Sequence, residues 1–309
     1  MKAACYLPLL LCLGVGSALA HSPIQLQHAA SATARISISN IAGSVNVTAW
    51  DRDEVQVSGE LGEGAKPLEI TGDNNHLVIK VAARSGSGWL NFGGDDKMSP
   101  STLEVNVPRA ASLEVNVISA PLVVDGLVGG NIKISAISGS ARIHAHIRSL
   151  EANSVSGSIE LSGHADQASL QTVSGEILAP ALGTTARLQT ISGRIQAGSG
   201  PWQKLSLSTV SGDVQLRGGL TSGGDVDIES MSGDVQWRLP TDTSAMLHAS
   251  SFSGNLRSDF GTPVQARHGP GSSLDTTIGA GNGKIHIETF SGNLRVRKQD
   301  DAGPNLPQR

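Results

Sequence analysis

The stretch ARLQTISGRI, residues 186–195, decides how this chain folds, because its pattern returns seven more times. The pattern is apolar, x, apolar, x, Ser or Thr, apolar, Ser, Gly, x, apolar. The other copies are IKISAISGSA (132–141), LEANSVSGSI (150–159), ASLQTVSGEI (168–177), LSLSTVSGDV (205–214), VDIESMSGDV (226–235), LHASSFSGNL (247–256) and IHIETFSGNL (285–294). A short, nearly fixed period of this kind is the signature of a solenoid of stacked repeats.

Each copy is numbered here from its glycine, which is position 0. Positions −7 and −5 are apolar or Ala and −6 and −4 mostly polar, which predicts a strand with one buried face. After the glycine the apolar positions are +2 and +4. A flat strand cannot change parity in this way, so each Ser-Gly pair must lie in a corner. The predicted structural corners are Ser138-Gly139, Ser156-Gly157, Ser174-Gly175, Ser192-Gly193, Ser211-Gly212, Ser232-Gly233, Ser253-Gly254 and Ser291-Gly292.

These features predict an all-β fold, a single-chain parallel β-solenoid (β-helix) with about 18–21 residues per repeat. Stacking the units about 4.8 Å apart buries apolar faces that no unit can bury alone. Right-handed winding is expected, because parallel crossovers are overwhelmingly right-handed. The hydroxyls at −3 and −1 are expected to form columns of buried, hydrogen-bonded groups. Eight equivalent serines without a repeated base beside them are structural, so no catalytic residue is predicted.

The ends of the chain differ from the repeats. Residues 1–20 combine Lys2, an apolar core and an Ala-Leu-Ala cleavage site, which predicts a signal peptide and export to the periplasm or the cell surface. Residues 21–34 are expected to be a polar leader and residues 298–309 a disordered tail. The predicted solenoid domain spans residues 35–297, with irregular stretches at 48–112 and 258–283.

Composition excludes several classes of function. Both cysteines, Cys5 and Cys12, lie in the predicted signal peptide, so the exported chain has neither disulfides nor thiolate chemistry. That chain carries 22 Lys and Arg against 27 Asp and Glu, without a basic stripe, so nucleic acid is not an expected partner. No second apolar run is long enough to span a membrane. No cofactor is predicted.

Two kinds of position allow weak metal candidates. His146 and His164 share position +7 in adjacent units, and Asp213 and Asp234 share position +1. Stacked imidazoles or carboxylates can hold a cation, but solvated ladder residues and ordinary residues after a glycine corner are the simpler explanation. His248 and His286 share position −6, with an irregular unit expected between them.

One Gly- and Ser-rich stretch, SGSGWLNFGGDDKMSPS at residues 85–101, is predicted to be a loop. It holds Trp89 and Phe92. Loop aromatics of this kind either contact a partner or fold back as a lid on the stack.

The Thr-apolar-Ser-Gly repeats, the IAGSVNVTAWD element (41–51) and the EVNVPRAASLEVNVISAPLVV segment (104–124) together resemble a bacterial family. This is a family of exported β-strand-repeat proteins of unknown function, often given the label of adhesin. The resemblance covers most of residues 34–297. It implies a fold and no catalytic or ligand residues, because a fold does not define a function.

Three hypotheses for function follow. The first is an exported, non-enzymatic β-solenoid that binds in the cell envelope, as an adhesin or in envelope maintenance, with an envelope protein or a glycan as partner. The alternative is a carbohydrate-active β-helix that binds or cleaves polysaccharide, which requires clustered carboxylates on one face. The third is a spacer that associates end to end, since uncapped solenoid ends are exposed edges.

Overall fold

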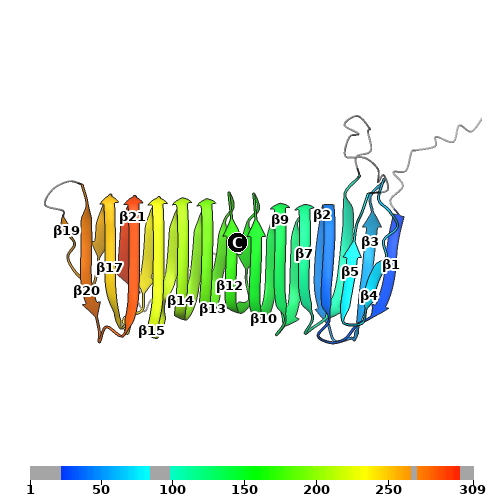
Figure 1. Cartoon of the computed structure of the whole chain (residues 1–309), viewed down its shortest axis with the longest axis horizontal. Coiled ribbons are helices and arrows are strands. Elements are labelled where there is room, and N and C mark those ends of the chain that lie inside the picture. Colours follow the sequence, from blue (N-terminus) through cyan, green and yellow to red (C-terminus); the bar gives the residue numbers. More distant parts are fainter. Residues whose placement is uncertain (1–21, 84–97, 266–269, 300–309) are drawn as a thin grey trace, which may run out of the picture.

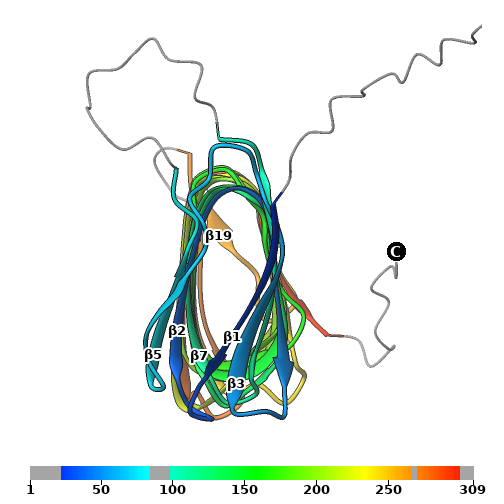
Figure 2. The same cartoon turned by 90° about the vertical axis from the view of Figure 1, so that its right-hand side faces the viewer.

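The computed structural model describes residues 22–83, 98–265 and 270–299. Over these ranges the chain forms 22 strands and no helix. The strands lie side by side in one long row (Figure 1). Seen along that row, they close into a flattened tube with two broad faces (Figure 2). The predicted all-β class is confirmed.

The middle of the tube is a ladder of parallel rungs. The repeats pair in register, so that Leu188 lies beside Leu207 and Leu207 beside Ile228. One face holds the residues before each glycine and the other face the residues after it. This agrees with the predicted β-solenoid, whose handedness stays a prediction. The strands are β7 (Ser112–Ser119), β8 (Leu122–Val128), β9 (Asn131–Ser138), β10 (Ala141–Ser154), β11 (Ile159–Leu161), β12 (His164–Thr172), β13 (Ile177–Ser192), β14 (Ile195–Ser211), β15 (Val214–Ser232) and β16 (Val235–Leu239).

The core lies between the two faces and runs the length of the tube. Positions −7, −5, +2 and +4 point inward, and Leu188, Ile195, Leu207 and Val214 are all fully or almost fully buried. Each fully buried aliphatic side chain of this size contributes about 1.5–3 kcal/mol. Burial of these side chains and the hydrogen bonds between rungs hold the tube together, and its described residues contain no cysteine.

The N-terminal end departs from the parallel ladder. Its strands are β1 (Ser22–Ala29), β2 (Arg35–Trp50), β3 (Glu54–Leu61), β4 (Ile70–Asp73), β5 (His76–Lys80) and β6 (Ser101–Pro108). β6 runs parallel to β2 and antiparallel to β3, and so lies between them. β1 pairs antiparallel with β3, and its Ile24 is buried. The predicted polar leader is therefore wrong over Ser22–Ala29, where alternating Ile24 and Leu26 allow a capping strand.

The C-terminal end places its strands out of chain order. The strands are β17 (Ala245–Ser253), β18 (Leu256–Ser258), β19 (Val264–Gln265), β20 (Ser272–Ile278), β21 (Gly283–Ser291) and β22 (Leu294–Lys298). β21 pairs with β15 on one side and β17 on the other, as Figure 1 shows. β20 then caps β17 in antiparallel orientation. The predicted irregular stretch 258–283 forms this cap. Its expected place between the rungs of His248 and His286 is wrong, because β21 returns to pair directly with β17.

The sheet is thus mixed, parallel in its middle and antiparallel at both ends. The prediction of a purely parallel solenoid fails in the two stretches that the sequence marks as irregular. Short antiparallel strands at the ends reduce the open hydrogen-bonding edge available to another chain. End-to-end association stays a prediction. The tail from residue 300 onward and the predicted signal peptide lie outside the described residues.

Candidate functional site

The repeated corners line up along one long edge of the tube, the upper edge in Figure 1. In each rung the strand breaks between positions −3 and +2, as between Ser138, where β9 ends, and Ala141, where β10 begins. Serines at −1 pair from rung to rung, Ser192 with Ser211 and Ser211 with Ser232. We call this line of corners the corner edge, and all eight predicted Ser-Gly pairs lie on it.

The glycines at position 0 are required by close backbone approach. A Cβ on Gly157 would overlap the carbonyl oxygen of Gly139, and a Cβ on Gly175 would overlap that of Gly157. The same relation holds for Gly193 over Gly175. Gly139 also has a φ of +126°, whereas no positive φ is found at the other three. The shared need is therefore space beneath the next rung, and the glycine column fixes how tightly the corners stack.

An exposed apolar column runs along the corner edge at position −2. Its members are 38% to 60% exposed, although they are branched, aromatic or Met side chains. They occupy consecutive rungs, and the two phenylalanine rings at the C-terminal end stack with centroids 4.9 Å apart. The ten members are Ile41, Ile118, Ile137, Val155, Val173, Ile191, Val210, Met231, Phe290 and Phe252. A contiguous exposed apolar stripe of this kind marks an interaction surface.

The serines at −1 do not behave as predicted. They were expected to form a buried column with the hydroxyls at −3, but seven of the eight are exposed and Ser291 is half-buried. The reason is that the change of parity falls on the serine itself, so that positions −2 and −1 both face solvent. The serine column therefore lies beside the apolar column and supplies it with a hydroxyl border.

The hydroxyls at −3 are buried, as predicted, and lie directly beneath the corner. Thr172 Oγ1 donates to the Gly157 carbonyl at 3.4 Å, and Thr289 Oγ1 donates to Ser251 Oγ at 3.2 Å. Thr190 Oγ1 and Thr209 Oγ1, by contrast, have no hydrogen-bond partner within the described part of the chain. Only some of the hydroxyls at −3 are therefore hydrogen-bonded within the described part of the chain.

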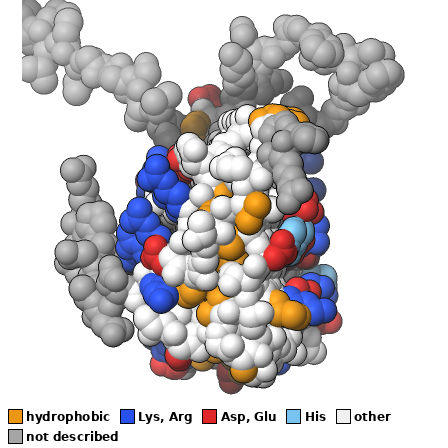
Figure 3. Space-filling model, turned by 90° about the vertical axis from the view of Figure 1, so that its left-hand side faces the viewer, with side chains coloured by type: hydrophobic (Ala, Val, Ile, Leu, Met, Phe, Trp, Pro, Cys, Tyr) orange, Lys and Arg blue, Asp and Glu red, His pale blue; other side chains and the backbone are white. Residues whose placement is uncertain are grey.

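Two hollows lie at the two ends of the apolar column. The N-terminal hollow, about 470 Å³, is lined by Ile41, Ile118 and Ile137 together with residues 80–83. The C-terminal hollow, about 1010 Å³, lies between Phe252 and Phe290 on the ladder and β19 with residues 270–273 on the cap. Figure 3 looks onto this end and shows hydrophobic side chains at its upper edge.

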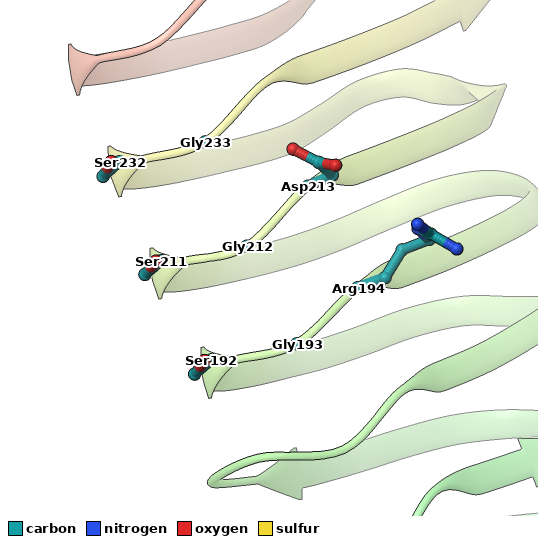
Figure 4. A pocket seen from close by; sticks show the side chains of 8 residues that line it. All are labelled: Ser192, Gly193, Arg194, Ser211, Gly212, Asp213, Ser232 and Gly233. Atoms are coloured by element: carbon teal, nitrogen blue, oxygen red, sulfur yellow. The ribbon is translucent and has the colours of Figure 1, made fainter.

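A third, polar hollow of about 320 Å³ lies in the middle of the corner edge (Figure 4). Its lining comprises three serines at −1, three glycines at 0, and the charged side chains of Arg194 and Asp213 at +1. In the figure Arg194 and Asp213 extend from successive rungs on the side away from the serines. The hollow therefore offers serine hydroxyls and both a positive and a negative side chain next to the apolar column.

The two aspartates predicted as weak metal candidates lie on adjacent rungs, but protein donors use their oxygens. Asp213 Oδ1 accepts from the Asp234 amide at 3.2 Å. Asp234 Oδ1 accepts from the Asn293 amide at 3.0 Å and from its side-chain Nδ2 at 2.9 Å. These bonds link each corner to the next rung, as side chains after a tight turn commonly do. The arrangement favours the structural explanation over the cation site.

The two predicted histidines lie in register on adjacent rungs, but no group of three ligand atoms within 4.8 Å of one another is found at them among the described residues. His146 pairs in register with His164. His164 lies 3.1 Å from the Ala181 carbonyl through Nδ1 and 3.3 Å from Asp166 through Nε2. Within the described ranges, three potential metal ligands converge elsewhere, at His248, His286 and Glu288. The sequence analysis missed this group because it placed another unit between the two rungs.

A family model matches residues 33–297, nearly the whole described solenoid. This chain belongs to the Toastrack DUF4097 family. The resemblance inferred from the repeats, to a family of unknown function, is thereby confirmed. No curated protein matches the Toastrack chain.

Several solved structures are similar to this Toastrack chain at low sequence identity. A "putative adhesin" from Bacteroides fragilis is 11% identical, covers 90% of this chain and 98% of its own, and has a TM-score of 0.45. A "putative lipid binding protein" from Parabacteroides distasonis is 14% identical, with coverages of 90% and 97% and a TM-score of 0.44. A "putative adhesin" from Parabacteroides merdae is 14% identical, with coverages of 70% and 92% and a TM-score of 0.37. Likeness at this level says nothing about what this chain binds.

Two further predictions concern a membrane span and the loop with Trp89 and Phe92. No helix in the described part of the Toastrack chain is long and apolar enough to cross a membrane. Trp89 and Phe92, predicted as a contact loop or lid, lie outside the described residues. Ala82 and Ala83, the last described residues before that stretch of the chain, line the N-terminal hollow.

The shifted pKa values of the Toastrack chain lie away from the corner edge. Arg109 donates to Asp51 through Nε at 2.7 Å and through a terminal nitrogen at 2.9 Å. This hydrogen-bonded ion pair lowers the pKa of Asp51 and raises that of Arg109. The Asn75 and His76 amides donate to Asp73 and lower its pKa. Both cases are explained by local structure, an ion pair between strand ends and a turn.

Proposed function

We propose that this chain is an exported, non-enzymatic β-solenoid that binds a protein of the bacterial cell envelope along its corner edge. The observation that carries the proposal is the apolar column, with ten half-exposed side chains on consecutive rungs. At about 4.8 Å per rung the column is about 43 Å long. The fold does not need these side chains for its core, so their repeated apolar character calls for another reason.

The size of the column suits a specific interface. About half of each side chain is exposed, so that covering all ten would remove several hundred Å² of apolar surface from water. A typical stable interface buries about 800 Å² on each partner. A partner that also contacts the serine border and one end hollow would reach that area.

The borders of the column favour an amphipathic protein segment as the occupant. The stripe is one side chain wide, with exposed serines on one side and polar residues at −4, such as Gln189 and Ser208, on the other. A partner with an apolar stripe between hydrogen-bonding groups complements the apolar column and the polar residues on both sides of it. A bare acyl chain would leave the bordering hydroxyls without partners and would gain less.

The proposal of a non-enzymatic role rests on where the chemistry-bearing groups lie. Catalysis needs acids, bases or nucleophiles tuned by burial or by neighbouring charges in one cleft. The groups with shifted pKa values, Asp51, Asp73 and Arg109, are instead exposed and engaged in local structure. No observation on the described residues favours the carbohydrate-active alternative.

Export is supported by the predicted signal peptide and by the lack of cysteine in the rest of the chain. A chain without thiols folds independently of the redox state of its compartment. The proposal leaves the choice between periplasm and cell surface open to the localisation experiment below.

The test measures binding of the purified chain, without its predicted signal peptide, to envelope fractions of the producing bacterium. Ile191→Asp and Val173→Asp place charges in the column. Thr184→Asp is the matched control, because Thr184 is exposed on the same strand as Ile191 and lies outside the corner edge and its borders. We expect each column variant to weaken binding at least tenfold, because burying an unpaired carboxylate is costly. The control should bind as the unaltered chain does. Equal binding by all variants would refute the proposal.

A second arm identifies the class of partner. Binding should disappear after protease digestion of the envelope fraction and should be absent with vesicles of extracted envelope lipid. Binding that survives digestion would mean a glycan or lipid ligand and would overturn the assignment to a protein. Fractionation with an antibody to the chain then distinguishes periplasm from cell surface.

A further inference from the structure

Outside the corner edge, three potential metal ligands converge on the outward surface near the C-terminal cap. His248 on β17 and His286 on β21 lie side by side, with ring centroids 5.1 Å apart and planes inclined by 5°. Glu288, two residues along β21, lies 3.3 Å from His286 Nε2 through Oε1. One ligand atom from each residue lies within 4.8 Å of the other two.

The contact between His286 and Glu288 already has the spacing of a metal site. Zinc binds imidazole nitrogen and carboxylate oxygen at about 2.0–2.2 Å. Two such ligands at a tetrahedral angle are therefore about 3.3 Å apart, as Nε2 and Oε1 are here. His248, which is half-buried, supplies a third ligand atom within 4.8 Å of the other two, so only a small adjustment of the side chains is needed to bring all three to one centre.

His248 also has the outer partner that metal-binding histidines require. Its Nδ1 lies 2.6 Å from Asp275 Oδ1 on β20, the strand antiparallel to β17. This bond fixes the ring orientation and the proton on Nδ1, and so leaves Nε2 free to bind. A carboxylate behind a histidine ligand in this way raises its basicity and orients it toward the metal.

The charge around the two imidazoles favours a cation. On the rung beneath, Asp227 lies in register with His286, and Glu229 lies in register with Glu288. Stacked carboxylates one rung apart repel each other, and a bound cation relieves that repulsion. With Asp275 on the other side, four carboxylates surround the pair.

We infer that His248, His286 and Glu288 form a binding site for a divalent transition-metal ion such as Zn²⁺. Asp275 acts as the outer hydrogen-bond partner, and solvent occupies the remaining coordination position. Two imidazoles and one carboxylate form a ligand set that suits zinc, nickel or copper and is poor for calcium or magnesium, which prefer oxygen ligands.

The place of the site in the fold indicates its role. Its ligands come from β17 and β21, and its outer partner comes from the cap strand β20. These three strands meet where the chain departs from sequential order. A bound ion would therefore link β21, the returning strand, to β17 directly and to the cap strand β20 through Asp275.

The experiment uses untagged chain treated with EDTA, with isothermal titration calorimetry and thermal unfolding as readouts and ZnCl₂ as the probe. We expect one ion per chain and a rise in Tm of about 5–10 °C at a hundredfold excess over Kd. Ca²⁺ and Mg²⁺ at the same concentration should leave Tm unchanged. His286→Ala and Glu288→Gln should abolish the response, and Asp275→Asn should weaken binding about 10–100-fold.

His164→Ala is the matched control, because His146 and His164 form the other in-register pair and Asp166 lies at the same 3.3 Å from His164. It should bind Zn²⁺ as the unaltered chain does. The substituted side chains are all partly exposed, so unfolding in EDTA checks that each variant is folded. Loss of binding in His164→Ala but not in His286→Ala would overturn the inference, as would an equal response to Ca²⁺ or no response to Zn²⁺.

Discussion

The glycine column makes a sharp prediction about stability. In Gly193→Ala the new methyl group would overlap the Gly175 carbonyl oxygen, and the backbone of Gly193 has no positive φ that would add a separate penalty. The two rungs must separate at the corner to relieve the overlap. The hydrogen bonds between these two rungs that lie closest to it run from the Ile177 amide to the Arg194 carbonyl, at 2.9 Å, and from the Ser192 amide to the Val173 carbonyl, at 2.8 Å.

The expected cost follows from these contacts. Weakening two net hydrogen bonds costs about 1–3 kcal/mol, and overpacking a tight site adds about 1–3 kcal/mol. We therefore expect Gly193→Ala to destabilise the fold by about 3 kcal/mol, or about 6–12 °C in Tm for a domain of this size. Calorimetry measures the shift. Hydrogen exchange localises it to the corner, which matters because solenoids can unfold in parts.

The control separates space from backbone conformation. Gly223 has a φ of +79° and no atom within 4 Å of a Cβ position, so Gly223→Ala pays only the left-handed penalty of about 1–2 kcal/mol. Gly139 combines both conditions and should be the most sensitive of the three to alanine. If Gly193→Ala proved no more destabilising than Gly223→Ala, close stacking would not be the reason for glycine at the corners.

Three further outcomes are expected. Leu188→Ala should lower the free energy of unfolding by about 2–5 kcal/mol, whereas Ile191→Ala, on the exposed column, should change it by less than about 0.5 kcal/mol in the same urea titration. Thr190→Val removes a buried hydroxyl that lacks a partner among the described residues, so it should leave the protein equally stable or raise its stability by about 1 kcal/mol; a loss above 1 kcal/mol would reveal a missed hydrogen bond. Because Arg109 lowers the pKa of Asp51 in the folded state, the pair stabilises the fold above the ordinary value of 3.8 and loses that effect as pH falls further. The Tm difference between the unaltered chain and Arg109→Gln should therefore shrink between pH 5 and pH 2.5, and a constant difference would contradict the assignment.

The sequence predicts the rungs well, because few other folds are compatible with a repeat of 18–21 residues in which apolar and polar residues alternate. It does not predict which rung neighbours which at the C-terminal end. The interval of 38 residues between Gly254 and Gly292 fits two sequential units, and nothing in the local pattern signals that β21 returns between β15 and β17. The cluster at His248 and His286 was missed for this reason.

The exposed apolar column was missed for a different reason. Apolar residues normally indicate burial, so the residue type of Ile191 and its equivalents does not indicate that they face solvent. One signal was available, since position −2 is even and the even positions before the glycine are otherwise polar. Conversely, Ser192 and the other serines at −1 sit at an odd position and were expected inside. Both errors come from placing the change of parity one residue too late.

The position of β21 has a consequence for how the protein is made. During synthesis the N-terminal part of a chain emerges first, so β17 is available well before the strand that separates it from β15. Until residues 283–291 arrive, β17 and its cap strand β20 have no rung that joins them to β15. Completion of the tube therefore waits for residues 283–291, and a product terminated before them would be left with a detached end that proteases can recognise.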